Sequence, residues 1–142
     1  MPALAAGPYN GAMTNQRGSD MSANGKVAIT MTTGLEDPEQ VTVALLTAVG
    51  AAEQGRPTLL FMAKEAVRLG LEGVAVGTAC DGCPPISDLV KRFDAAGGRL
   101  LLCPICFNAK QLPADHIVSN ADLGGTVQLW EWIGDGATTF SF

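Results

Sequence analysis

The most constraining feature of this sequence is a regular alternation between short apolar runs and segments with helical spacing. Short runs rich in apolar and β-branched residues are typical of buried strands, whereas apolar residues at every third or fourth position are typical of helices. The predicted strands are 26–32, 58–62, 73–76, 99–102 and 138–142, and the predicted helices are 37–55, 64–69, 84–96, 104–112 and 121–133. Such alternation predicts an α/β protein with three α/β/α layers and a mostly parallel sheet of about five strands.

The length of 142 residues fits a single domain. Residues 1–25 are rich in Gly, Ala, Ser, Asn and Pro and predict a flexible leader, and residues 26–142 are predicted to form the α/β domain. The sequence has no apolar run of about 18 residues that would span a membrane. Its first residues also do not have the pattern of a secretory signal. We therefore expect a cytoplasmic protein, in which thiols are kept reduced.

The charge composition excludes some partners and favours others. Nine Lys and Arg residues against fourteen Asp and Glu residues give a net charge of -5, so we expect no binding to nucleic acid. Only 16% of the residues are charged, compared with about 25% in an average soluble domain. This shortage favours a homo-oligomer whose subunits cover part of the surface. Trp130 and Trp132, together with Phe140 and Phe142, are expected in the core or in subunit contacts.

Two Cys-x-x-Cys pairs carry the main chemical signal. Cys80 and Cys83 follow the predicted strand 73–76, and Cys103 and Cys106 follow the predicted strand 99–102. In parallel α/β sheets the functional residues gather at the carboxyl ends of the strands. If these two strands are neighbours, about 4.8 Å apart, all four sulfur atoms approach one another.

This pattern leaves several hypotheses open. In the first, Cys103 is a reactive thiol at a strand-to-helix junction, where backbone N–H groups stabilise a thiolate that carries sulfur as a persulfide, with Cys106 one turn further on. In the second, Cys80, Cys83, Cys103 and Cys106 form a tetrahedral zinc site. In the third, some cysteines are simply small buried apolar side chains. A thiol–disulfide switch through one pair is a further alternative. The first hypothesis requires no cofactor, and the second requires zinc.

Other residues near the predicted strand ends are candidates for a pocket. Thr33 and Gly34 either line a pocket beside Cys103 or form a tight turn after the first strand. Lys110 is either a positive charge near the Cys103 thiolate or a solvated side chain. His116, the single histidine, is expected on a surface loop.

Two stretches of the chain also follow a recognisable order of motifs. Residues 29–61 contain a strand, the loop Thr32-Thr33-Gly34 and an alanine-rich helix that ends at Gly55. Residues 89–112 contain a helix, an Ala-Gly-Gly turn and a strand that leads to Cys103. In this order and spacing, residues 26–142 resemble the DsrE/DsrF-like family.

The resemblance implies an α/β protein that assembles as a homo-trimer or homo-hexamer. In sulfur-relay members it implies sulfur carried as a persulfide on the cysteine that corresponds to Cys103, with a sulfur donor or acceptor protein as partner. The sequence departs from the family pattern at Lys110, where an arginine is frequent, and at Cys80 and Cys83, which are outside the common motif. We expect a sulfur carrier or sulfurtransferase-type thiol protein that uses Cys103 and Cys106, with Cys80 and Cys83 as relay acceptors.

Overall fold

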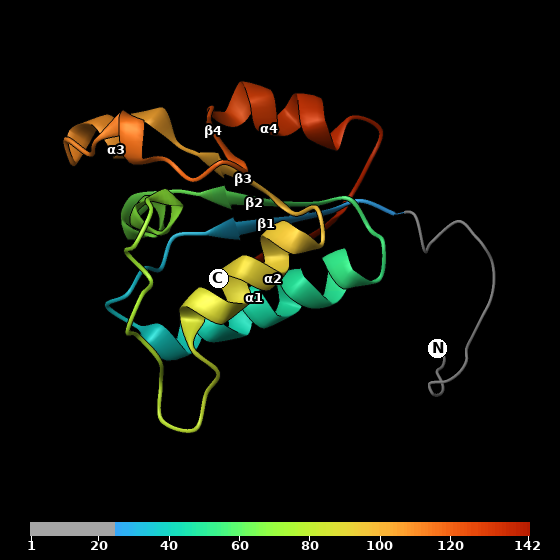
Figure 1. Cartoon of the computed structure of the whole chain (residues 1–142). Coiled ribbons are helices and arrows are strands. Elements are labelled where there is room, and N and C mark those ends of the chain that lie inside the picture. The colour runs from blue at the N-terminus through green and yellow to red at the C-terminus, as the bar shows by residue number, and fades with distance from the viewer. Residues whose placement is uncertain (1–24) are drawn as a thin grey trace.

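Five parallel strands form one sheet. In Figure 1, this sheet lies between helices above and below it. The computed structural model describes residues 25–142. The strands are β1 (Val27–Met31), β2 (Thr58–Met62), β3 (Arg99–Leu102), β4 (Ala121–Leu123) and β5 (Thr138–Ser141). They lie in the order β4-β3-β2-β1-β5, and all four pairings are parallel.

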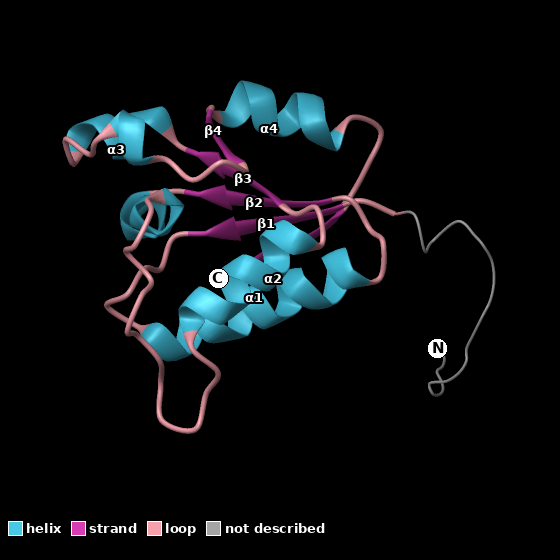
Figure 2. Ribbon diagram, in the orientation of Figure 1, coloured by secondary structure: helices cyan, strands magenta, loops and turns pink. Residues whose placement is uncertain are grey.

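Helices cover both faces of this sheet (Figure 2). The helices α1 (Pro38–Glu53) and α2 (Ile86–Ala95) lie side by side on one face, and α3 (Pro104–Ala109) and α4 (Thr126–Ile133) lie on the other side. Two short 3₁₀ helices, η3 (Lys64–Gly70) and η4 (Ala114–His116), complete the fold. The predicted three-layer α/β/α architecture with a parallel sheet in one domain is confirmed.

The start of α1 follows directly from its sequence. The Gln40 backbone N–H donates a hydrogen bond to the Asp37 carboxylate (N···O 3.2 Å), which satisfies a donor that has no partner within the helix. Pro38 occupies the first turn, where its missing N–H costs nothing. These are the two signals that predict a helix starting at residues 37 and 38.

The two faces of the sheet are buried to different extents. The face toward α1 and α2 holds the larger hydrophobic cluster, which includes Leu45, Leu60 and Phe93. The opposite face holds a smaller cluster of Leu59, Phe61 and Leu101, against which Leu129 and Trp132 of α4 pack. No residue of α4 is fully buried. The α4 side of the domain is therefore the less completely covered of the two.

One predicted strand is wrong, and the error affects the site. Residues 73–76 form consecutive turns, in which the Val76 N–H donates to the Gly73 carbonyl oxygen (N···O 3.2 Å). Gly73 and Gly77 both have a φ of +81°, a conformation that a strand does not contain. Val76 is 70% exposed, so the apolar run Gly-Val-Ala-Val does not reflect burial in a sheet.

The fifth strand comes instead from a segment predicted as helix. Residues 121–133 contain β4, a break at Gly124 and Gly125, and then the shorter helix α4. A Cβ atom at Gly124 would lie 2.6 Å from Leu101 Cδ1, so the chain approaches β3 too closely for a side chain there. The strand count of about five is confirmed, but β4 replaces the predicted strand 73–76.

The N-terminal prediction lies largely outside the described residues. Of the predicted leader at 1–25, only Gly25 belongs to the part of the chain that the structure describes. Within that part, no helix has both the length and the apolar character needed to cross a membrane.

Candidate functional site

Cys103 lies at the carboxyl edge of the sheet, where β3 passes directly into α3. Its N–H donates to the Met62 carbonyl oxygen at the end of β2, and its carbonyl oxygen accepts from the Phe107 N–H in α3, both with N···O distances of 2.9 Å. The next residue, Pro104, is the first of α3. Because sheet and helix both hold the Cys103 backbone, the position of its side chain is defined by the fold.

The neighbours of Cys103 along this edge are small. The continued strand pairing places Ala63 beside it on the β2 side and Gly124 on the β4 side, where the Gly124 N–H donates to the Leu102 carbonyl oxygen (3.0 Å). The Cys103 side chain packs against both hydrophobic clusters and is half-buried. The Cys103 thiol thus contacts apolar side chains on its inner side and remains partly exposed to solvent.

Cys106 is a second thiol on the same helix. Cys103 and Cys106 are both free cysteines, and both are half-buried. Cys103 is the N-cap of α3 and Cys106 is the third residue of the helix, so Cys106 lies in the first turn, which the hydrogen bond from the Phe107 N–H to the Cys103 carbonyl oxygen closes. Ile105 between them is 80% exposed. The prediction that Cys106 lies about one turn beyond Cys103 is confirmed.

An ion-pair cluster connects α3 to η3. Lys110 Nζ lies 3.4 Å from Glu65 Oε2, and the Arg68 guanidinium lies 2.8 Å from Glu65 Oε1. The hydrogen bond from Arg68, and to a smaller extent that from Lys110, lower the pKa of Glu65 below its usual range. The Lys110 side chain is only 20% exposed and is paired with Glu65, so it is not the freely solvated side chain of one prediction. The sequence does not single out Glu65 and Arg68 directly, but their opposite charges three residues apart are the feature from which this ion pair could have been predicted.

Thr33 and Gly34 lie at the same edge but two strands away from Cys103. The end of β2 and the start of η3 stand between them, so the separation is roughly 10 Å, or two strand spacings. Thr33 Oγ1 accepts a hydrogen bond from Gln40 Nε2 (3.4 Å). A Cβ atom at Gly34 would lie 2.7 Å from the Glu65 carbonyl oxygen. Gly34 is therefore needed for close packing of its loop against η3.

Cys80 and Cys83 form a disulfide in the segment between η3 and α2. The prediction that they join Cys103 and Cys106 in a four-cysteine cluster depended on a strand at 73–76 beside β3. In the structure, β2 and β4 occupy the two sides of β3, so that cluster does not form. Cys80 contacts Thr42 of α1, on the opposite side of the sheet from α3. Among residues 25–142, no three His, Cys, Asp or Glu side chains are grouped so that they could hold a metal ion.

The single histidine is also outside the site. His116 is exposed in η4, and its carbonyl oxygen accepts a hydrogen bond from the Glu72 N–H (2.9 Å). The prediction of a surface position is confirmed.

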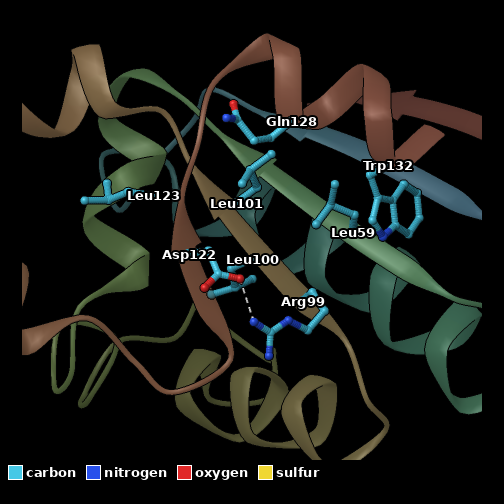
Figure 3. Close-up of a pocket in the computed structure, with 8 residues that line it drawn as sticks. All are labelled: Leu59, Arg99, Leu100, Leu101, Asp122, Leu123, Gln128 and Trp132. Carbon is cyan, nitrogen blue, oxygen red and sulfur yellow. Dashed lines mark hydrogen bonds and ion pairs between the residues drawn. The ribbon is translucent and has the colours of Figure 1, made fainter. Parts of the chain in front are cut away.

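A cavity of about 340 Å³ lies between β3, β4 and α4. Figure 3 shows its apolar walls and the ion pair between Arg99 Nη2 and Asp122 Oδ2 (2.7 Å). The ion pair is half-exposed and contributes little to stability. The lining residues, none of which is a cysteine, are Leu59, Arg99, Leu100, Leu101, Asp122, Leu123, Gln128 and Trp132. This cavity continues the incompletely covered α4 side, and its Leu59 and Leu101 belong to the smaller cluster against which Cys103 also packs.

Fold and site together define a three-layer α/β protein with two free thiols at a strand-to-helix junction. Its fold is similar to that of the ychN protein from E. coli, with a TM-score of 0.68 and 22% identity over 83% of this chain and 99% of that chain. A protein of unknown function from Methanobacterium thermoautotrophicum has a TM-score of 0.59 and 12% identity over 82% of this chain and 98% of that one. A conserved protein of unknown function from Bacteroides thetaiotaomicron has a TM-score of 0.59 and 20% identity over 87% and 100%, respectively. No family model and no curated protein matches the sequence. These likenesses establish the fold alone.

Proposed function

We propose that this protein is a sulfur carrier of the DsrE/DsrF-like type, which holds a persulfide on Cys103. The observation that carries the proposal is the position of Cys103 as a free, half-buried thiol whose backbone is held by both β3 and α3. Carboxyl ends of parallel strands are where such folds place their chemistry. The sequence resemblance assigns the sulfur-bearing role to the same residue.

The loading step is a transfer of sulfane sulfur from a donor persulfide. The Cys103 thiolate attacks the outer sulfur of the donor R–S–SH, a new S–S bond forms to Cys103, and the S–S bond of the donor breaks. The products are the Cys103 persulfide and the thiolate R–S⁻, so atoms and electrons balance without a further reagent.

Cys106 is the nearest candidate for a second thiol in this reaction. It lies one helical turn from Cys103 and is also free. Its thiolate can attack the inner sulfur of the Cys103 persulfide, which forms a Cys103–Cys106 disulfide and releases hydrosulfide. Cys80 and Cys83 are not part of the proposed transfer, because they lie in a disulfide near α1.

We further propose that the carrier is a homo-oligomer, a trimer or hexamer by the family resemblance. Large apolar side chains are exposed on the α3 and α4 side of the domain, namely Ile105, Leu123, Val127 and Trp130, which are 80%, 41%, 65% and 68% exposed. A second copy is the occupant that best explains so few charged residues in the chain. Native mass spectrometry of the full chain is expected to show an oligomer that Trp130→Gln weakens. A wild-type monomer at all concentrations would contradict this proposal.

The test of the carrier function is intact mass spectrometry of the full chain after incubation with a glutathione persulfide donor. Every chain carries Cys80→Ser and Cys83→Ser, so that sulfur on the disulfide pair does not contribute. We expect mass increases in steps of one sulfur atom, absent when Cys103→Ser is added and retained when Cys106→Ser is added instead. Circular dichroism checks that the variants fold. Equal loading of the Cys103→Ser chain would overturn the assignment.

A further inference from the structure

The Cys80–Cys83 disulfide lies outside the proposed carrier site and has no role in it. It belongs to the segment between η3 and α2, which is held at its ends by the Leu71–Ile117 bridge and by a hydrogen bond from the Ile86 N–H to the Thr78 carbonyl oxygen (3.1 Å). Between these two anchors, the chain follows successive turns. The disulfide is therefore attached to a framework that does not depend on it.

The geometry of the pair argues against a purely structural disulfide. A disulfide stabilises a fold mainly by closing a loop in the unfolded chain, and the gain is smallest for short loops. Only Asp81 and Gly82 stand between these cysteines. The turn already has its own hydrogen bond from the Cys83 N–H to the Cys80 carbonyl oxygen (3.0 Å), and Gly82 supplies the positive φ of +75° that it requires.

The two sulfur atoms are in different surroundings. Cys80 Sγ lies 3.6 Å from Thr42 Oγ1, and Thr42 is buried in the first turns of α1. The Thr42 hydroxyl donates its own hydrogen to the Pro38 carbonyl oxygen (2.7 Å), so a lone pair of its oxygen is available to Cys80. Cys83 Sγ contacts the carbonyl oxygen of the exposed Asp81 (3.8 Å) and stands just before the start of α2. Both cysteines are half-buried, but Cys80 contacts a buried side chain and Cys83 contacts an exposed turn residue. We therefore call Cys80 the inner sulfur and Cys83 the outer one.

We propose that Cys80 and Cys83 form a thiol–disulfide exchange site for an external dithiol, with Cys83 as the exchanging sulfur and Cys80 as the resolving sulfur. A thiolate of the dithiol attacks Cys83 Sγ, the Cys80–Cys83 bond breaks, and Cys80 leaves as a thiolate that takes up a proton. The second thiolate of the dithiol then attacks the dithiol sulfur that is bonded to Cys83. This closes a disulfide within the dithiol and releases Cys83 as a thiolate. Two electrons and two protons pass to the pair, and the dithiol becomes a disulfide.

The contact with Thr42 suits the reduced state of this site. A disulfide sulfur has no hydrogen to donate, whereas the reduced Cys80 thiol can donate one to Thr42 Oγ1. Reduction therefore adds a hydrogen bond at the inner sulfur. Because Thr42 engages only the Cys80 sulfur, Cys83 is the sulfur left free to react with partners.

The first experiment uses the full chain with Cys103→Ser and Cys106→Ser, so that the only thiols counted are those of the proposed site. We expect no free thiol after air oxidation, two after dithiothreitol, and a return to none with glutathione disulfide, measured by thiol titration and intact mass. Two thiols that resist oxidation by glutathione disulfide, or a disulfide that dithiothreitol reduces only after unfolding, would overturn the proposal. Both outcomes are independent of persulfide loading on Cys103.

The second experiment tests the two roles in the same background. With Cys80→Ser, the remaining Cys83 is expected to form a mixed disulfide with glutathione about tenfold faster than Cys80 does in the Cys83→Ser chain. Thr42→Val keeps the side-chain volume and removes the acceptor, so the equilibrium with glutathione shifts toward the disulfide by about twofold to tenfold. Equal rates for the two cysteines, together with no shift for Thr42→Val, would refute the assigned roles.

Discussion

Substitution of Gly34 tests whether the loop after β1 serves packing or the thiol site. A Cβ atom at this position would lie 2.7 Å from the Glu65 carbonyl oxygen and 2.9 Å from its carbonyl carbon. Both are backbone atoms of η3, which cannot swing aside as a side chain can. Gly34→Ala therefore forces the loop and η3 apart.

The magnitude follows from two opposing effects. Overpacking of a closely packed site costs about 1–3 kcal/mol, and the loss of unfolded-state entropy on replacing glycine returns about 0.4–1 kcal/mol. The difference between the midpoints of these two ranges is an expected net decrease of about 1.3 kcal/mol in the free energy of unfolding. Gly50 is the matched control, because it lies inside α1 and a methyl group added there would meet no neighbouring atom within 4 Å. Gly50→Ala should raise stability by about 0.5–1 kcal/mol.

Urea unfolding, followed by circular dichroism at one protein concentration, measures both variants. Persulfide loading of the folded Gly34→Ala chain is expected to match the wild type, because Gly34 is two strands from Cys103. A Gly34→Ala chain as stable as the wild type would refute the packing argument. A stable fold with impaired loading would support the predicted pocket-lining role of Gly34.

Three further predictions concern stability and metal content. Phe93→Ala should lower the free energy of unfolding by about 3–5 kcal/mol in urea titrations, because the ring is buried in the larger cluster; a loss under about 1 kcal/mol would contradict this. The hydrogen bond from Arg92 holds the pKa of Glu53 below its usual range, so this pair stabilises the fold at neutral pH and the contribution disappears as the pH falls through the folded-state pKa. Arg92→Gln should therefore reduce the loss of stability on acidification, and an unchanged pH profile would argue against the ion pair. Reduced full chain should contain no stoichiometric zinc by elemental analysis, since the described cysteines do not cluster; a stoichiometric amount would favour the four-cysteine zinc hypothesis.

Much of the fold could be predicted because several local signals agree with it. The apolar run of β2 is buried at every position, and the Asp37 cap and Pro38 mark the start of α1. The two errors concern short segments in which composition and packing disagree. Gly-Val-Ala-Val at 73–76 has the composition of a strand but forms turns in which Ala75 is buried and Val76 is exposed, and Ala121–Leu123 has little β preference but pairs with β3. The adjacent glycines 124 and 125 were a signal that this segment is not one continuous helix.

The same error decided how much of the site could be predicted. The junction between β3 and α3 was evident in the sequence, and so the positions of Cys103 and Cys106 could be predicted. The grouping of all four cysteines could not, because it depends on which strands are neighbours. Strand order is a property of long-range packing, and no local pattern reports that β2 and β4 occupy the two sides of β3.

The position of β5 also bears on how the chain folds during synthesis. β1 is an interior strand of the finished sheet, yet one of its edges pairs only with β5. Thr32 and Phe142, which are 110 residues apart, bond across that edge. A nascent chain whose C-terminal residues are still inside the ribosome can pair β1, β2 and β3 but leaves this edge of β1 without its partner. Unpaired parallel edges recruit other chains. Ribosome pausing before residue 138 should therefore favour aggregation or binding of a chaperone at β1.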